Sequence, residues 1–279
     1  MIGERDPTYL RSDQYRDSRN LETRISFYQR YATNPREISS WILEQVRLPD
    51  RARVLEVGCG IGEFWARNLP RVPAGWEILL TDFSEGVMSA ARERLSRAGR
   101  PFGFRVADVQ DLPFPEGSFD GVLANHMLYH VPDLESALRE IARVLTGTGR
   151  LYASTNGAGH LAEIYELERI FRVSPDEHEH ARFTCENGAS ILGRYFRQVR
   201  FLRFDDSVIA TSRDDVVRFV LSRVPEAMAT PERTATLQAK VARLFEEGGG
   251  QLRAGENIGL FEGSEPWRPG TVSEEEPAV

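Results

Sequence analysis

Short apolar runs alternate with amphipathic segments through the middle of this chain. Because strands that alternate with helices are joined by crossover connections, the pattern predicts an α/β fold with a parallel sheet and helices on both faces. The predicted strands are 53–57, 77–82, 102–106, 119–124 and 149–155, and the helices between them lie near 62–69, 84–97 and 133–145.

The flanking regions are predicted to be mostly helical. Apolar residues at helical spacing predict one helix from Asn20 and another after Pro35, and further helices at 158–172, from Thr184, from Asp214 and at 231–247. Residues 199–204 and 258–261 read as the last two strands. We therefore expect an N-terminal arm and lid helix (1–34), a core (35–157, 183–205 and 255–263), a helical cap (158–182 and 206–254) and a disordered tail (264–279).

A glycine-rich turn follows the first predicted core strand. Glycines stand at 58, 60 and 62, where a bare backbone allows a tight turn and close approach of a ligand. The turn leads into a helix start, so backbone N–H groups face the crevice beyond the strand. Glu56 precedes it, and this acid would repel a pyrophosphate. The spacing G-x-G-x-G also differs from that of a dinucleotide site, so a ligand with a positive charge fits better.

Three further segments follow the turn in order. Residues 77–84 read as an apolar strand that ends in Asp82, which lies 20 residues after Gly62 and suits an acid that accepts ribose hydroxyls. Residues 104–114 carry Asp108, and residues 118–131 form a strand followed by a loop that contains Asn125.

Together these four segments resemble the class I S-adenosylmethionine-dependent methyltransferases, small-molecule (natural-product) branch. The resemblance covers about residues 35–155, more weakly 183–204 and 257–262. It implies a Rossmann-like sheet of seven strands, mostly parallel with the last strand antiparallel, and S-adenosylmethionine as the cofactor. The cofactor-binding residues that it implies are Glu56, Gly58, Gly60, Asp82, Phe83, Asp108, Val109, Asn125 and Tyr28.

Methyl transfer requires alignment of a nucleophile with the methyl group, and a general base when the nucleophile must lose a proton. The candidates are His126 and His130 in the loop after the fourth strand, and His160 at the start of the cap. The two histidines of the loop could instead pack against the methionine part of the cofactor or the end of the sheet. Tyr28 could simply be buried by its helical spacing. His178 and His180 are expected to be solvated rather than to bind a metal, and no metal is expected.

Composition narrows the classes of partner. The net charge is −7, which argues against a dedicated nucleic-acid-binding protein. The two cysteines are too few for a disulfide framework or a zinc site. No signal peptide and no run of about 18 apolar residues is found, so we expect a cytoplasmic protein without a membrane partner. A homodimer stays open.

Three functions are compatible with these residues. The first is methylation of oxygen, nitrogen or carbon in a small molecule, as in secondary-metabolite tailoring. The second is a non-methylating relative, a cyclase or binding protein that keeps the cofactor pocket. The third is an RNA or protein methyltransferase, which the acidic balance and the absence of an Asn-Pro-Pro-Tyr-type motif after the fourth strand disfavour: the chain has Asn125-His126-Met127-Leu128 there.

Overall fold

The computed structural model describes residues 18–171 and 182–267 of the 279. Within them, seven strands form one sheet: β1 Arg51–Val57, β2 Gly75–Asp82, β3 Gly103–Val106, β4 Phe119–Asn125, β5 Leu145–Asn156, β6 Phe196–Ala210 and β7 Leu252–Pro266. The α-helices are α2 Arg19–Tyr31, α3 Ile38–Gln45, α4 Glu63–Asn68, α5 Glu85–Leu95, α6 Leu134–Val144, α7 Ala162–Glu168, α8 Gly188–Leu192, α9 Arg213–Leu221 and α10 Pro231–Glu247.

The strand order is β3-β2-β1-β4-β5-β7-β6. The strands from β3 to β5 run parallel, whereas β7 is antiparallel to both of its neighbours, β5 and β6. The predicted sheet, mostly parallel with an antiparallel last strand, is therefore confirmed. The chain reverses its direction of winding between β1 and β4, and in open α/β sheets the crevice at such a point binds ligands.

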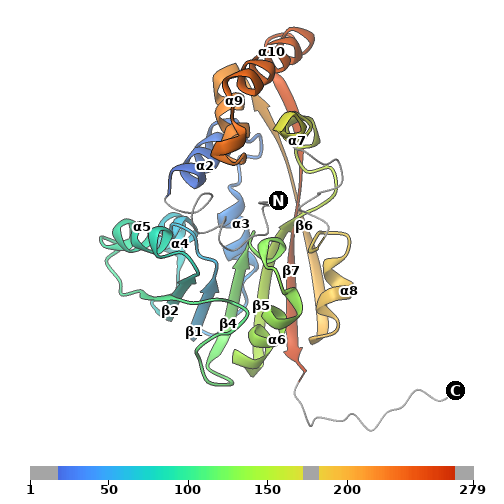
Figure 1. The fold of residues 1–279 in the computed structure, drawn as a ribbon. Helices are drawn as coiled ribbons and strands as arrows, with labels where there is room; N and C mark the ends of the chain where they lie inside the picture. The colour runs from blue at the N-terminus through green and yellow to red at the C-terminus, as the bar shows by residue number, and fades with distance from the viewer. Residues whose placement is uncertain (1–17, 172–181, 268–279) are drawn as a thin grey trace, which may run out of the picture.

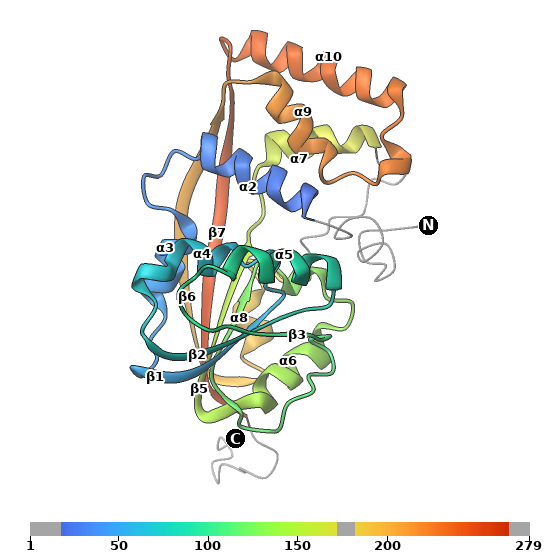
Figure 2. The same cartoon turned by 90° about the vertical axis from the view of Figure 1, so that its left-hand side faces the viewer.

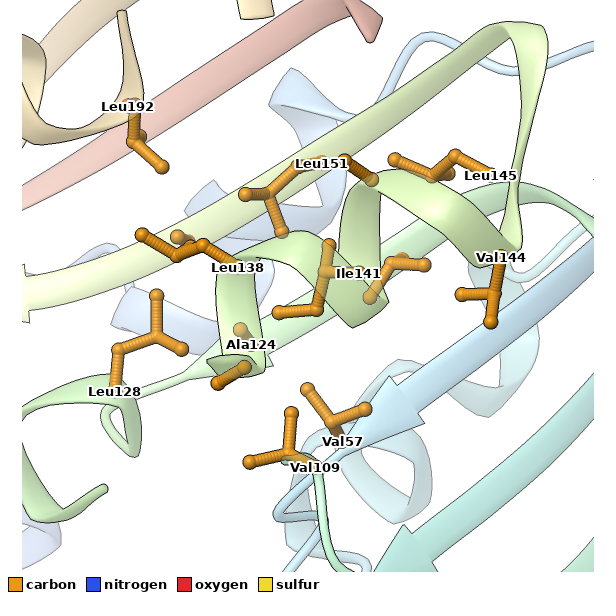
Figure 3. Close-up of a cluster of buried hydrophobic side chains, with 14 of the residues drawn as sticks. Val57, Val109, Ala124, Leu128, Leu138, Ile141, Val144, Leu145, Leu151 and Leu192 are labelled. Carbon is orange, nitrogen blue, oxygen red and sulfur yellow. The ribbon is translucent and has the colours of Figure 1, made fainter. Parts of the chain in front are cut away.

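Helices cover both faces of the sheet (Figure 1). On one face, α6 packs against β4 and β5 through fully buried side chains such as Leu138 and Ile141, which interdigitate with Ala124 and Leu151 (Figure 3). On the other face, α3, α4 and α5 bury side chains including Trp41 against the sheet. Strands buried on both faces read as continuous apolar runs, which is why the sequence revealed them.

Strands β6 and β7 are much longer than predicted. They pair continuously from Phe196↔Pro266 to Ala210↔Leu252 and leave the core as a two-stranded ribbon. The predicted bounds of the helical cap, 206–254, therefore extend too far at both ends, because residues 206–210 and 252–254 continue the ribbon. The expected disordered tail also begins too early: residues 264–266 belong to β7, and residues 268–279 lie outside the described part.

The ribbon carries a cap made of α2, α7, α9 and α10 (Figure 2). These helices share one buried apolar cluster with the outer ends of β6 and β7. Helix α2 is fixed in it by Asp215 of α9, whose carboxylate accepts a hydrogen bond from the Tyr31 hydroxyl at 2.5 Å and pairs with Arg30. The predicted lid helix is therefore part of the cap. Among the described helices, none is both long and apolar enough to cross a membrane.

Candidate functional site

A cavity of about 320 Å³ lies at the carboxyl ends of β1, β2 and β4. Its walls come from the glycine-rich turn, the loops after β2, β3 and β4, and helix α2. A larger, open depression of about 760 Å³ lies at the amino ends of the strands, near Arg51 and Gly75 at the start of β1 and β2. We place the site at the carboxyl ends, because the polar side chains of the motifs converge there.

The glycine-rich turn forms the floor of this cavity. Gly58 and Gly60 have φ angles of 63° and 55°, in the left-handed region that favours glycine. A Cβ atom on Gly58 would lie 2.8 Å from Cβ of Met127, and one on Gly60 would lie 3.0 Å from a methyl carbon of Leu21. The two glycines therefore allow the loop after β4 and helix α2 to approach the turn closely.

Asp82 stands at the tip of β2 and holds two loops in place. Its Oδ2 atom accepts a hydrogen bond from the Gly60 N–H at 3.1 Å, and its Oδ1 atom accepts one from the Ser84 N–H at 3.0 Å. Only 7% of Asp82 is exposed, and burial raises the pKa of its carboxyl group against the opposing effect of these N–H groups. The carboxylate faces the cavity and keeps lone pairs for ligand hydroxyl groups.

Glu56 is a buried acid at the end of β1. Its Oε2 atom accepts a hydrogen bond from the Trp65 indole at 2.6 Å, and its Oε1 atom accepts one from the Asn125 amide at 2.9 Å. Burial raises the pKa of Glu56 to about 7, although both hydrogen bonds act in the opposite direction. A cationic group beside Glu56 would favour the carboxylate form, so this position suits a ligand that carries an ammonium group.

This raised pKa predicts a pH dependence of stability. Glu56 binds its proton more tightly in the folded than in the unfolded chain, so its stabilising contribution is complete below pH 4.5 and is lost as the pH rises through about 7. We expect the free energy of unfolding, measured in urea without ligand, to fall by about 2–3 kcal/mol more between pH 5 and pH 8 than in Glu56→Gln. Equal pH slopes for both proteins would contradict a raised pKa.

The loops after β2 and β3 supply the next wall. Phe83, Asp108 and Val109 line the cavity. Both carboxylate oxygens of Asp108 accept hydrogen bonds from the Gln110 amide, at 2.9 and 3.1 Å, which fixes the side chain at the rim. These residues line one space together with Glu56, Gly58, Gly60, Asp82 and Asn125.

The candidate histidines separate into two groups. His126 and His130 line the cavity. His160 and Tyr28 lie outside its lining: their side chains approach each other at 3.4 Å, and the His160 Nδ1 atom accepts a hydrogen bond from the Asn257 N–H at 3.2 Å. The structure therefore places His126 and His130 at the cavity, whereas His160 and Tyr28 lie in the adjoining cap. His178 and His180 lie outside the described residues.

Some lining residues were not among the predicted site residues. Leu21 and Ile25 of α2 close the cavity, and Met127 packs against the glycine-rich turn. The apolar stripe of α2 was recognised in the sequence, but Tyr31 from the same stripe enters the cap core instead. Helical periodicity alone does not indicate which of two cores a residue joins.

The arrangement fits a nucleoside ligand with a charged amino-acid tail. The bare turn leaves room that a Cβ atom would fill, Asp82 offers an acceptor for hydroxyl groups, and Glu56 offers a negative charge. Among the described residues, no three His, Cys, Asp or Glu side chains form a group that could hold a metal ion.

Comparison with known proteins gives the following matches. Residues 55–153 match the family described as "Methyltransferase domain". The malonyl-[acyl-carrier protein] O-methyltransferase of Halorhodospira halophila is 27% identical over 253 residues, 85% of this chain and 82% of that protein. The ubiquinone biosynthesis O-methyltransferase of Xanthomonas axonopodis is 33% identical over 136 residues, which cover 47% of this chain. This chain spans little more than half the length of the latter, 56%.

The fold has a clear counterpart among solved structures. The YcgJ protein of Bacillus subtilis superposes with a TM-score of 0.58 at 18% identity, covering 82% of this chain and 98% of that one. At this identity the similarity establishes the fold alone.

Proposed function

Because this chain belongs to the class I S-adenosylmethionine-dependent methyltransferases, we propose that it transfers the methyl group of S-adenosylmethionine to a small-molecule acceptor. The observation that carries this proposal is the convergence of three acids on one cavity. Glu56 and Asp82 stand at the ends of β1 and β2, Asp108 follows β3, and all three face the same space beyond the glycine-rich turn.

Each of these residues has a proposed task in binding the cofactor. Asp82 would accept the ribose hydroxyl groups, and Asp108 with Val109 would hold the adenine ring. Glu56 and Asn125 would lie beside the amino-acid tail, where the carboxylate of Glu56 compensates the ammonium charge. The glycine-rich turn lets the cofactor lie against the backbone.

When bound, S-adenosylmethionine supplies an electrophilic methyl group attached to a good leaving group. The task of the protein is then to hold the acceptor in line with that methyl group and to exclude water. Helix α2 closes the cavity through Leu21 and Ile25, and the cap continues from it. We propose that the acceptor enters between the cap and the loop after β4.

We propose His130 as the residue that contacts the acceptor and, where the nucleophile must lose a proton, removes it. His126 is a weaker candidate for this task. Burial lowers its pKa to about 4, and the neighbouring His130 contributes to the shift, so its imidazole is a poor proton acceptor at neutral pH. His160 stays a candidate only for an acceptor that extends into the cap.

The finer assignments are also proposals. A cap that encloses the acceptor suits natural-product tailoring, and we propose a cytoplasmic location and allow for a homodimer.

The proposal can be tested with the full chain, S-adenosylmethionine and fractionated cell extract. We expect mass spectrometry to detect products one methyl group heavier in the low-molecular-weight fraction, together with S-adenosylhomocysteine. Methylation confined to the RNA or protein fraction would contradict a small-molecule acceptor. Binding of the cofactor without turnover in any fraction would favour the non-methylating alternative.

A further inference from the structure

Two buried acceptor atoms lie beside the proposed cofactor cavity, on the face of the sheet that α2 covers. These are Oε1 of Glu256 on β7 and Oδ1 of Asn156 at the end of β5. Each is inaccessible to solvent and has no hydrogen-bond partner among the described residues. Glu256 is 7% exposed, as is Asn156. Buried polar atoms in native proteins nearly always have partners, so two such atoms near one another require an explanation.

The register of the sheet places them together. Asn156 pairs with Ile258 on β7, and Glu256 lies two residues from Ile258 on the same strand. Residues paired directly across an antiparallel ladder share a face, as do residues two apart in a strand, so both side chains project from the same face. They are diagonal neighbours in the ladder, with an expected Cα separation of about 7–8 Å.

The same register places the pair next to the cofactor cavity. Ser154 lies two residues before Asn156 and so projects from the same face. Its hydroxyl oxygen accepts a hydrogen bond from the N–H of His126, which lines the cavity, at 3.1 Å. The two buried oxygen atoms therefore lie one step along the strands beyond the cavity wall. This is the region in which we propose that the methylated substrate binds.

Helix α2 lies over this place. Residue Ala32, just after the helix, forms a bridge to Val208 on β6, and the Ala32 N–H donates to the Tyr28 carbonyl. Glu256 acts on Tyr28 electrostatically and raises the pKa of its hydroxyl, after burial and Tyr165. Tyr28, on α2, and Glu256, on β7, thus face a common interior.

A carboxylate at Glu256 would be poorly compensated. Burial raises the pKa of Glu256 to about 8, and the carboxylate of Asp206, its pairing partner on β6, acts in the same direction. A neutral hydroxyl group could donate one hydrogen bond, but it would not stabilise the carboxylate form of Glu256. An ammonium group offers three N–H donors and a positive charge, and it can serve both acceptor atoms at once.

We propose that Glu256 and Asn156 form a subsite that binds a basic nitrogen of the methyl acceptor, so that the substrate is a small molecule bearing an amine. This inference rests on the proposed function, since it places the subsite in the acceptor region. It makes Glu256 a specificity-determining residue rather than a catalytic one. The amine is an anchor, and the methylated atom can be a different one.

The test uses benzylamine and benzyl alcohol, which match in size and differ in charge. Each is titrated by calorimetry into the full chain saturated with S-adenosylhomocysteine. We expect benzylamine to bind roughly tenfold more tightly than the alcohol, because charge-assisted hydrogen bonds are about twice as strong. Glu256→Gln should abolish the preference, Asn156→Leu should reduce it, and Glu163→Gln, at an exposed position of the cap, should retain it.

A second readout needs no variant. At pH 7 most Glu256 side chains are protonated, so an ammonium that binds their charged form should release about one proton. The heat of benzylamine binding should then depend on the ionisation enthalpy of the buffer, whereas that of the alcohol should not. Asp206 and Tyr28 are titratable groups that interact electrostatically with Glu256.

The possible outcomes separate the subsite from the proposed function. Equal binding of amine and alcohol to the S-adenosylhomocysteine complex would overturn the subsite and leave the function intact. A preference that survives in Glu256→Gln would also overturn it, because the attraction would then come from the net charge of −7. Failure of the wild-type chain to bind S-adenosylhomocysteine would contradict the proposed function itself, and the subsite with it.

Discussion

Replacing Gly58 with alanine should destabilise the protein by about 2–5 kcal/mol. Alanine in the left-handed region, where Gly58 has φ 63°, costs about 1–2 kcal/mol. The new Cβ atom would also lie 2.8 Å from Cβ of Met127. Because that atom is attached directly to the backbone, the loop after β4 must shift, which adds about 1–3 kcal/mol. Urea unfolding of the ligand-free protein measures the sum.

Gly99→Ala is the matched control for this change. Gly99 also has a left-handed φ, 69°, but a Cβ atom there would meet nothing within 4 Å. The difference between the two variants therefore isolates the contact with Met127. Similar losses of stability for both would contradict the close packing of the glycine-rich turn against the loop after β4. Since Met127 lines the cavity, we also expect Gly58→Ala to bind S-adenosylmethionine more weakly.

The second large effect is expected at Asp82. Replacing it with alanine should weaken S-adenosylmethionine binding by about 1–3 kcal/mol, or roughly 5- to 150-fold in Kd. The substitution removes the proposed acceptor for the ribose hydroxyl groups. It also removes the two hydrogen bonds that hold the Gly60 and Ser84 N–H groups, so the floor of the cavity loses its support.

Asp111→Asn provides the comparison, since Asp111 is exposed and lies three residues after Asp108. It removes one negative charge from the same side of the sheet without touching the cavity. Calorimetry should show nearly unchanged binding in this variant. An equal loss of affinity in both would mean that the charge of the region, rather than contact with Asp82, governs binding.

Most of the core could be predicted because its strands are recognisable from short stretches of sequence. Buried parallel strands produce apolar runs, and Asp82 and Glu56 stand at the ends of such runs, so the converging carboxyl ends of parallel strands bring them together. The apolar runs that mark the strands in the sequence therefore also indicate where Glu56 and Asp82 lie in the sheet.

The length of the β6–β7 ribbon was underestimated from the sequence for a physical reason. Once the ribbon leaves the core it no longer has helices on both faces, so polar residues such as Asp205, Asp206 and Ser207 interrupt the apolar pattern. The register of β6 with β7 is fixed by pairing across the 41 intervening residues, 211–251, and no local sequence pattern indicates it.

The positions of the cap residues could not be predicted from the sequence either, because they too depend on contacts between distant parts of the chain. Tyr28 meets His160 only because α2 is fixed to β6 and α9 by long-range contacts. Glu256 was not among the predicted site residues, because an acid in a polar stretch before a predicted strand gives no sign of burial. Its burial follows from the length of the ribbon.

The S-adenosylmethionine site is tested most directly by a calorimetric titration of the full wild-type chain with S-adenosylmethionine, on protein shown to be folded by circular dichroism. We expect saturable binding at one site per chain, weakened in Asp82→Ala and retained in Asp111→Asn. The absence of any heat of binding, confirmed by the absence of a thermal shift, would contradict the assignment of this cavity as an S-adenosylmethionine site.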